Sequence, residues 1–291
     1  MSSPMTGTPS EASAPASSAN LGPGFDCLAL ALEIRCRVRA WRSERWKVRH
    51  DGRHRPPPES ADAVLAGAQA AVGSEHPLRL EVDNHVPIGS GLGSSAAAYA
   101  AGAAAALRSV GRPVDAHRIF RLVTALEGHA DNAAAAVFGG LALVDPGGRV
   151  RKLTMSDAYG LMVLVPAFRL FTSESRSVVP ERFELPAVVN SLSRMAALVA
   201  GLTSGEAGIL RSALGDELHE TSRNRLRPSV GKLIGEALNA GAVYAAWSGS
   251  GPSVLVLTRS SETGRVVEAL SSSLGDQVEI ACPSIASRGI V

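Results

Sequence analysis

Hydrophobic and polar positions alternate with two different periods, and the two periods follow one another in short segments along the chain. In the segment 27–40, charged residues such as Arg35 occupy one face and apolar residues such as Ile34 the other, which is the period of a half-buried strand. The segment 113–127 repeats its apolar residues every three or four positions and therefore predicts an amphipathic helix. Strands and helices mixed in this way predict an α+β protein.

The same patterns divide the rest of the chain into elements. Further strands are expected at 78–84, 141–145, 161–166, 243–247, 254–258 and 277–282. Further helices are expected at 61–72, 96–107, 186–202, 206–218, 230–240 and 262–274. Residues 42–58 are expected to form a strand fragment followed by a loop, and residues 127–140 a turn followed by a short helix.

A division into two domains follows from the chain length and from the turn at 146–148. A chain of 291 residues is long enough for two cores of medium size. We expect a disordered tail at 1–12, a first domain at 13–152 and a second domain at 153–291. The tail is rich in Ser, Thr and Pro, which favours disorder.

Composition narrows the class of protein. Hydrophobic residues make up 45% of the chain and charged residues 19%, as in an ordinary globular protein. A net charge of +2 with interspersed signs, and only 4% aromatic residues, argue against nucleic acid or an acidic membrane surface as a partner. The 3 cysteines are scattered without metal-ligand spacing, which predicts free thiols in a reducing compartment. We see no signal-peptide pattern and no apolar run of about 18 residues, and we therefore expect a cytoplasmic protein.

The most informative stretch is the loop 87–98, Pro-Ile-Gly-Ser-Gly-Leu-Gly-Ser-Ser-Ala-Ala-Ala. Gly89, Gly91 and Gly93 lie between an expected strand and an alanine-rich helix. Glycine lets a ligand approach the main chain closely, and the unpaired N–H groups at a helix N-terminus favour an anion. A phosphate group is the expected ligand of this loop.

The loop lacks the features of two other phosphate-binding loops. No Gly-Lys-Ser/Thr follows, as it would in a Walker A loop, and the glycine spacing is not that of a dinucleotide fingerprint. A purely structural strand-to-helix turn, with Ser94 as the N-cap, stays open on the loop alone.

Several spaced motifs resemble a known family when they are taken together. Besides the loop at 87–98, they are PASSANLGPGFD (15–26), EGHADNAAA (127–135), TSESRSVVP (172–180) and WSGSGPSVL (247–255). Their types and order resemble the GHMP small-molecule kinases, and among these the homoserine kinases. The resemblance extends from residue 15 to about residue 258, which is most of the chain.

The resemblance implies a fold and an activity. The fold is a two-domain GHMP-kinase architecture, in which an N-terminal α+β domain resembles the second domain of ribosomal protein S5 and the C-terminal domain is ferredoxin-like. ATP and the substrate lie in the cleft between the domains. The implied activity is transfer of the ATP γ-phosphoryl group to the hydroxyl of L-homoserine in threonine biosynthesis, by a homodimer without nucleic-acid or membrane partners.

The resemblance also implies a role for each nucleotide-binding motif. The loop residues implied to wrap the ATP phosphates are Pro87, Gly89, Ser90, Gly91, Leu92, Gly93, Ser94, Ser95 and Ala96. A loop serine (Ser94 or Ser95) and Glu127 are implied to hold Mg²⁺, which prefers a few hard oxygen ligands together with phosphate and water. Asp62 is implied on the adenine side. The third motif contributes Ser248, Gly249 and Gly251.

The amino-acid substrate is implied to lie among charged side chains. Arg176 and Arg223 match the carboxylate-binding arginines of the family, and a guanidinium offers the two-pronged geometry that a carboxylate fits. The other implied substrate-binding residues are Asn20, Asp26, His129 and Asp131, with Asp131 facing the ammonium. The catalytic candidates are Asp131, Asn20 and Arg176. Because phosphoryl transfer depends mainly on positioning and charge neutralisation, Asp131 is only a fallback as a general base.

Two departures from the homoserine kinase pattern keep alternatives open. Ala130 stands where that pattern has proline, and Thr221-Ser222 stands where it has Pro-Tyr. A related kinase that phosphorylates another amino alcohol, such as threonine or an intermediate of specialised metabolism, is therefore the main alternative. A binding protein that has lost catalysis is the other, and the intact Glu127, Ser94 and Ser95 argue against it.

Overall fold

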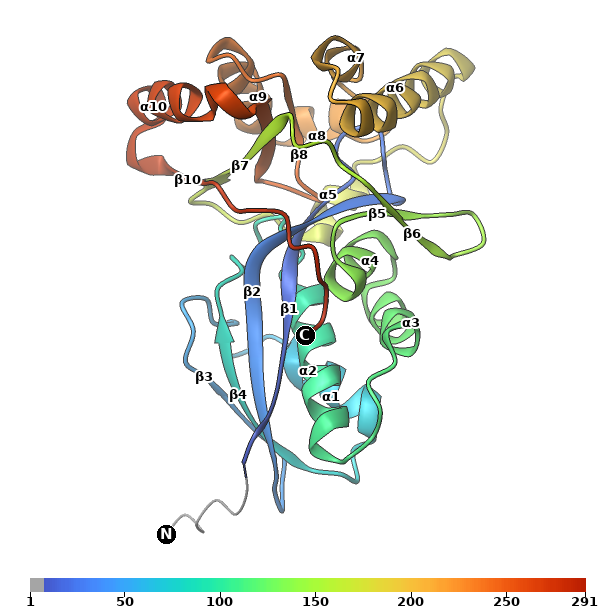
Figure 1. Ribbon diagram of the computed structural model, residues 1–291, viewed down its shortest axis with the longest axis vertical. Helices are drawn as coiled ribbons and strands as arrows, with labels where there is room; N and C mark the ends of the chain where they lie inside the picture. Colours follow the sequence, from blue (N-terminus) through green and yellow to red (C-terminus); the bar gives the residue numbers. More distant parts are fainter. Residues whose placement is uncertain (1–7) are drawn as a thin grey trace.

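Two sheets organise the computed structural model, which describes residues 8–291, and they lie one above the other in Figure 1. The first sheet has the order β3-β4-β2-β5-β6, with β1 paired to β2. Its strands are β1 (Ser10–Ala19), β2 (Leu28–Arg42), β3 (Lys47–His50), β4 (Leu78–Asn84), β5 (Leu141–Val144) and β6 (Val150–Leu153). The second sheet has the order β10-β7-β9-β8, with β7 (Tyr159–Pro166), β8 (Tyr244–Trp247), β9 (Val254–Arg259) and β10 (Val278–Ala281).

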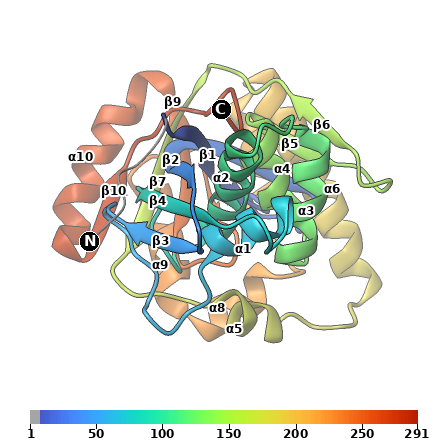
Figure 2. The same ribbon diagram turned by 90° about the horizontal axis from the view of Figure 1, so that it is seen from below.

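Each sheet has its own helices. Those of the first domain are α1 (Ala63–Val72), α2 (Ser94–Ser109), α3 (Ala116–Glu127) and α4 (Asp131–Phe138). Those of the second domain are α5 (Thr172–Ser177), α6 (Leu185–Ser204), α7 (Ala207–Ser212), α8 (Glu220–Leu226), α9 (Pro228–Asn239) and α10 (Thr263–Leu274). Seen from below in Figure 2, α1 to α4 lie together beside the first sheet. The expected two-domain α+β architecture is confirmed.

The second domain has a ferredoxin-like topology. Its four strands, numbered from β7 to β10 along the chain, occur in the spatial order fourth, first, third, second, and all of the pairs are antiparallel. Helices lie between β7 and β8, and α10 lies between β9 and β10. One side of this sheet packs on α9 and α10 through residues such as Val230 and Val266.

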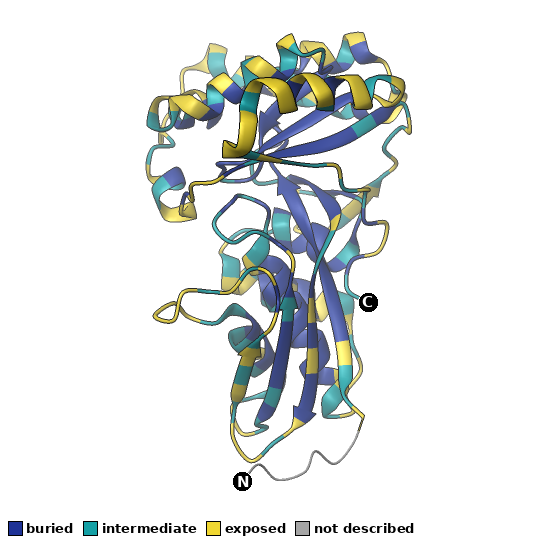
Figure 3. Cartoon of the chain, turned by 90° about the vertical axis from the view of Figure 1, so that its left-hand side faces the viewer, coloured by how far each residue is buried: buried dark blue, intermediate teal, exposed yellow. Residues whose placement is uncertain are grey.

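Strand β2 joins the two domains. Its C-terminal half alternates between buried and exposed positions as expected, but its N-terminal residues, such as Leu28 and Leu30, are all buried. They belong to a hydrophobic cluster that also contains Val163 and Tyr244 of the second sheet. Figure 3 shows this continuous buried zone between the domains. The two domains therefore share one core where they meet.

The alanine-rich helix α2 lies at the centre of the first domain. Small side chains allow it to approach α1 and β1 closely, and most of its residues are buried. Two helical glycines make the contact with α1 possible. A Cβ on Gly67 would lie 2.4 Å from the carbonyl oxygen of Tyr99, and one on Gly102 would lie 2.3 Å from that of Val64.

The chain returns to the first domain at its C-terminal end. Backbone hydrogen bonds join Ser13 and Val291 in both directions, at 2.8 and 3.0 Å. The guanidinium of Arg35 donates to the carbonyl oxygens of Arg288 and Gly289 at 2.9 Å. The boundary expected at 152/153 lies at the end of β6. The last residues of the chain, although they follow the second domain in sequence, pack on the first domain.

Several sequence predictions need correction. The tail expected at 1–12 lies outside the described residues up to residue 7, but Ser10–Ala12 already belongs to β1. Ser94 is not the N-cap of α2, because Gly93 occupies that position in the left-handed conformation. The helix expected at 206–218 spans only Ala207–Ser212, and Gly215, with φ +80°, lies in the loop that follows it. The short helices α5 and α8, and strand β6, were not predicted.

Helix α6 is long and apolar enough to cross a membrane by length and composition alone, which the sequence analysis did not single out. It is also a helix of the second domain. Its buried residues include Leu198 and Leu202, and the guanidinium of Arg194 forms an ion pair with Glu217 at 3.1 Å. A single helix of this kind is weak support for a membrane span.

The tight packing of α1 on α2 gives a stability prediction. Replacing Gly102 by alanine places a Cβ against the Val64 carbonyl, so we expect a loss of about 1–3 kcal/mol in the free energy of unfolding. The matched control is Gly235→Ala in α9, where a Cβ meets nothing within 4 Å. That change removes only the low helix propensity of glycine, so it should raise the free energy of unfolding by up to about 1 kcal/mol. Urea unfolding of both variants measures the difference, and equal effects would contradict the packing argument.

Candidate active site

A cavity of about 330 Å³ lies between the two domains. Its wall includes the glycine-rich loop, the N-terminal ends of α1, α2 and α4, and the segment that leads into α5. The turn 20–26 contributes Asn20 and Asp26, and the second domain contributes Arg176 and Arg223. Residues from every motif of the sequence analysis therefore meet at one cavity.

The glycine-rich loop is held from both domains. Gly91 has φ +80°, and a Cβ there would lie 2.3 Å from the carbonyl oxygen of Ser248, so only glycine fits. The Ser248 hydroxyl donates to the Gly91 carbonyl oxygen at 2.9 Å, and the Ser253 N–H donates to that of Ser90 at 3.0 Å. Residues 248–253 of the second domain therefore hold the glycine-rich loop in place just before α2 begins.

The first turn of α2 faces an acidic group. Glu127 ends α3, and its Oε1 is buried without a hydrogen-bond partner among the described residues. Burial raises the pKa of Glu127, and the Ser95 hydroxyl and His129 offset this only in part. A buried carboxylate oxygen without a partner, beside a serine of the glycine-rich loop, fits the ligand chemistry of Mg²⁺. Within residues 8–291, no group of three or more His, Cys, Asp or Glu side chains is arranged to hold a metal by itself.

Next to Glu127 lies a short chain of charged side chains. His129 Nδ1 is 2.8 Å from Asp131 Oδ1, and His129 Nε2 is 3.5 Å from Glu127 Oε2. Burial opposes protonation of His129, but the hydrogen bond to Asp131 and the two negative charges exceed it and raise the pKa of His129. Asp131 Oδ1 also accepts the N–H of Asn132 at 2.8 Å. Asp131, which borders the cavity, thus already accepts hydrogen bonds from His129 and Asn132 at Oδ1.

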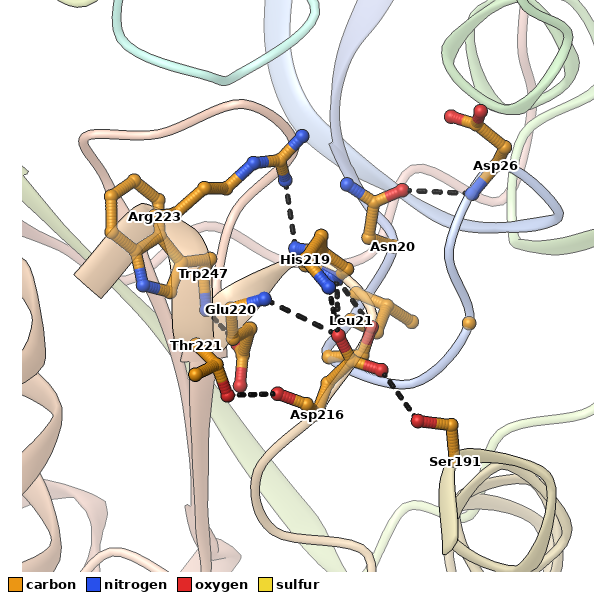
Figure 4. Close-up of polar contacts among 12 residues, drawn as sticks. Asn20, Leu21, Asp26, Ser191, Asp216, His219, Glu220, Thr221, Arg223 and Trp247 are labelled. Carbon is orange, nitrogen blue, oxygen red and sulfur yellow. Dashed lines mark hydrogen bonds and ion pairs between the residues drawn. The ribbon is translucent and has the colours of Figure 1, made fainter. Parts of the chain in front are cut away.

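The turn 20–26 is fastened to the second domain by its polar groups. Asn20 has φ +67°, and its side chain donates to the Gly249 carbonyl at 3.0 Å and accepts the Asp26 N–H at 3.0 Å. The Tyr244 hydroxyl donates to the Leu21 carbonyl at 2.7 Å. Figure 4 shows the contact between Asn20 and Asp26. Asn20 shapes the site from a conformation that few residues other than glycine adopt.

Two of the expected substrate-binding residues pair with each other. The Arg176 guanidinium donates to both oxygens of Asp26, at 3.0 and 2.5 Å. Hydrogen bonding to Asp26 raises the pKa of Arg176, and burial only partly opposes this. Both side chains are more than a third exposed, so the pair borders the cavity with its charges largely neutralised.

Arg223 is different, because it is only 1% exposed and no carboxylate lies within ion-pair distance of it among the described residues. Its Nη1 donates to His219 Nδ1 at 2.8 Å and to the Gly249 carbonyl at 2.9 Å, and its Nε donates to the Ser175 carbonyl at 3.4 Å. Burial and the charge of Arg176 lower the pKa of Arg223 to about 10, so it remains a cation. Asp26, Glu220 and Asp216 favour this cation from beyond ion-pair distance. A buried cation without an ion-pair partner, on a cavity wall, is suited to bind an anion.

Asp62 borders the cavity from the first domain. It is the N-cap of α1, where its Oδ1 accepts the N–H of Leu65 at 3.0 Å. Its Oδ2 lies 2.7 Å from Nε2 of His50. Burial raises the pKa of Asp62, but the hydrogen bonds from His50 and Leu65 exceed this and lower it overall. Both oxygens of the Asp62 carboxylate therefore already have hydrogen-bond partners within the protein. Asp62 and its neighbours still border the cavity.

Sequence reasoning missed some residues of the cavity wall. Asn132 borders the cavity from the first turn of α4, and its Oδ1 accepts the hydroxyl of Ser17 at 2.8 Å. It directly follows Asp131 in a motif that was quoted, so the signal was present in the sequence. Thr172 and Ser250 approach each other at the rim, with 3.2 Å between their hydroxyls. Only the folded chain brings these two together.

Comparison with known proteins identifies the family. The model of the GHMP kinases N terminal domain matches residues 60–140, and that of the GHMP kinases C terminal domain matches residues 195–276. A homoserine kinase of Deinococcus radiodurans is 36% identical over 96% of this chain and 99% of its own length. The chain belongs to the GHMP kinase family. A homoserine kinase of Thermus thermophilus is also 36% identical, over 90% of this chain and 91% of its own length.

Solved structures agree with the GHMP kinase fold. The crystal structure of homoserine kinase from Cytophaga hutchinsonii superposes with a TM-score of 0.84 at 25% identity, over 100% of this chain and 99% of that one. A mevalonate kinase shares the fold at 12% identity, with a TM-score of 0.69 over 94% and 98% of the two chains. The two-domain GHMP-kinase architecture expected from the motifs is confirmed, and its motifs line one cavity.

A buried acid behind this GHMP-kinase site gives a pH prediction. Burial raises the pKa of Glu220 from 4.5 to about 7, although the N–H of Trp247 donates to its Oε1 at 2.8 Å. Between pH 4.5 and about pH 7, Glu220 therefore keeps its proton in the folded protein but has lost it in the unfolded chain. Stability should fall as the pH rises through this window, by up to about 3 kcal/mol.

The variant Glu220→Gln isolates this effect, because the amide keeps the acceptor for Trp247 and does not ionise. Urea unfolding at pH 5 and pH 7.5 should give similar stabilities at the lower pH and a more stable variant at the higher pH. The same difference at both pH values would show that ionisation of Glu220 is not the cause.

Proposed function

We propose that this GHMP kinase transfers the γ-phosphoryl group of ATP to the side-chain hydroxyl of L-homoserine and produces O-phospho-L-homoserine and ADP. The similarity to homoserine kinases over nearly the full length supports this choice of substrate. GHMP kinases use ATP as the phosphoryl donor, and the glycine-rich loop at the N-terminus of α2 provides its phosphate site.

The observation that carries the proposal is the buried guanidinium of Arg223 on the cavity wall. Its Nη2 has no hydrogen-bond partner among the described residues, while Nη1 and Nε are engaged. A substrate carboxylate would supply the missing counter-charge and two hydrogen bonds. An amino acid with a terminal hydroxyl would then extend from Arg223 towards the phosphate loop, which borders the same cavity.

The other charged groups complement this placement. The negative side chains around His129 would favour a substrate ammonium. The ion pair between Arg176 and Asp26 would border the part of the cavity that holds the amino acid. Asp131 already accepts two hydrogen bonds at Oδ1, so we assign it to orienting His129 and the substrate rather than to proton abstraction. Asn20 would fix the turn, and positioning rather than a strong base would carry catalysis.

Magnesium completes the proposed site. Glu127, whose Oε1 lacks a partner, and a serine at the start of α2 would hold the ion. Bound Mg²⁺ would neutralise charge on the phosphate groups. Asp62 would border the adenine side. We further propose, from the family resemblance, a homodimer in the cytoplasm that acts in threonine biosynthesis.

The test is turnover with product identification. Purified protein with Mg²⁺-ATP is offered L-homoserine, L-threonine and L-serine at equal concentrations, and ADP release and the phosphate monoester are measured. The proposal expects the highest kcat/KM for L-homoserine. A higher value for another alcohol would support the alternative substrate, which the sequence departures at Ala130 and Thr221-Ser222 suggest. ATP binding without turnover of any alcohol would contradict kinase activity altogether.

A further inference from the structure

His219 occupies a fully buried position between the two domains, behind the proposed substrate site. Its Nε2 is 2.8 Å from the carbonyl oxygen of Gly22, and its Nδ1 is 2.8 Å from Nη1 of Arg223. A carbonyl can only accept, so Nε2 carries the hydrogen. A guanidinium can only donate, so Nδ1 carries the lone pair. The two contacts fix one neutral tautomer of His219 (Figure 4).

The surroundings of His219 keep it in that tautomer. Burial and the charge of Arg223 lower the pKa of His219 to about 4, while Asp216, Asp26 and the contact with Gly22 act in the opposite direction. The Phe25 ring stacks on the imidazole with 4.9 Å between the ring centroids. Asp216 Oδ2 accepts the backbone N–H of His219 at 2.6 Å and so fixes the start of α8.

The contact with His219 determines how Arg223 presents its charge. Both hydrogens of Nη1 are used, one by His219 and one by the Gly249 carbonyl, and Nε is used by the Ser175 carbonyl. All three acceptors are neutral, so they set the plane of the guanidinium without cancelling its charge. In Figure 4 one terminal nitrogen of Arg223 points at His219 and the other points away from it.

We propose that His219 is a positioning residue for the amino-acid substrate: its Nδ1 lone pair holds Arg223 so that Nη2 faces the substrate carboxylate. The inference rests on the proposed function, because it assumes that Arg223 binds that carboxylate. A carboxylate at position 219 would hold the guanidinium equally well but would neutralise it. A neutral imidazole acceptor orients the cation and leaves its charge for the substrate.

Two substitutions separate the two hydrogen bonds of His219. Asparagine can place its Oδ1 near the position of Nδ1, so His219→Asn keeps the acceptor for Arg223 and loses the donor to Gly22. Glutamine can place its amide nitrogen near the position of Nε2, so His219→Gln keeps the donor and loses the acceptor. The inference expects His219→Gln to raise KM for L-homoserine about tenfold or more, with kcat and KM for ATP within about twofold. It expects His219→Asn to remain within about threefold of the wild type for all three constants.

Tyr244→Phe is the matched control. Like His219, the Tyr244 side chain is buried and donates to a carbonyl of the turn 20–26, but it does not contact Arg223. Its loss should lower the thermal stability without a selective change in KM for L-homoserine. If Tyr244→Phe and His219→Gln raise this KM equally, the anchoring of the turn is responsible and the inference is overturned.

Arg223→Ala distinguishes failure of the inference from failure of the proposed function. If Arg223→Ala raises KM for L-homoserine strongly and His219→Gln does not, Arg223 binds the substrate without help from His219, and only the inference fails. If neither variant changes that KM in a protein that turns over L-homoserine, the assignment of Arg223 fails as well. Circular dichroism and thermal unfolding establish that each variant is folded, and a misfolded His219→Gln is replaced by His219→Met, which also lacks the acceptor.

Discussion

A buried positive charge without a negative partner is the constraint on which the site depends. Burying an unpaired ion costs several kcal/mol, so a fold tolerates it only where hydrogen bonds compensate in part and a ligand does the rest. Two backbone carbonyls and His219 hold the Arg223 guanidinium, which meets the first condition, and Arg223 borders the cavity, where the proposed substrate carboxylate would meet the second. The nearby Arg176 is already neutralised by Asp26, so the two arginines are not equivalent.

The contact between the domains creates this arrangement. The turn 20–26 carries residues in left-handed conformations, and the second domain fastens it through Tyr244, His219 and Gly249. The third motif holds the phosphate loop through Ser248 in the same way. The loop that would bind ATP and the arginine that would bind the amino acid are thus fixed by one shared interface. A change in the docking of the domains would therefore move both.

Much of the fold was predictable because periodicity and glycine positions are local properties of the sequence. Strand β4 and helix α10 lie within a residue or so of the expected ranges, and the motifs that line the cavity were recognised. Predictions failed where specific side-chain contacts, rather than hydrophobic periodicity, determine where an element begins or which side chains pair. Helix α8 begins where the Asp216 carboxylate accepts backbone N–H groups, a capping contact three residues away that apolar periodicity does not reveal. The pairing of Arg176 with Asp26 links residues 150 positions apart, and no local pattern predicts it.

The most direct measurement compares two alcohols that differ only in the carboxylate. L-Homoserine and 3-aminopropan-1-ol are offered to the wild type and to Arg223→Ala, and kcat/KM is measured for all four pairs. If the buried charge of Arg223 binds the carboxylate, the wild type prefers L-homoserine by about 100-fold or more and the variant loses at least about tenfold of that preference. The same preference in both proteins would show that Arg223 does not recognise the carboxylate, and would contradict the account.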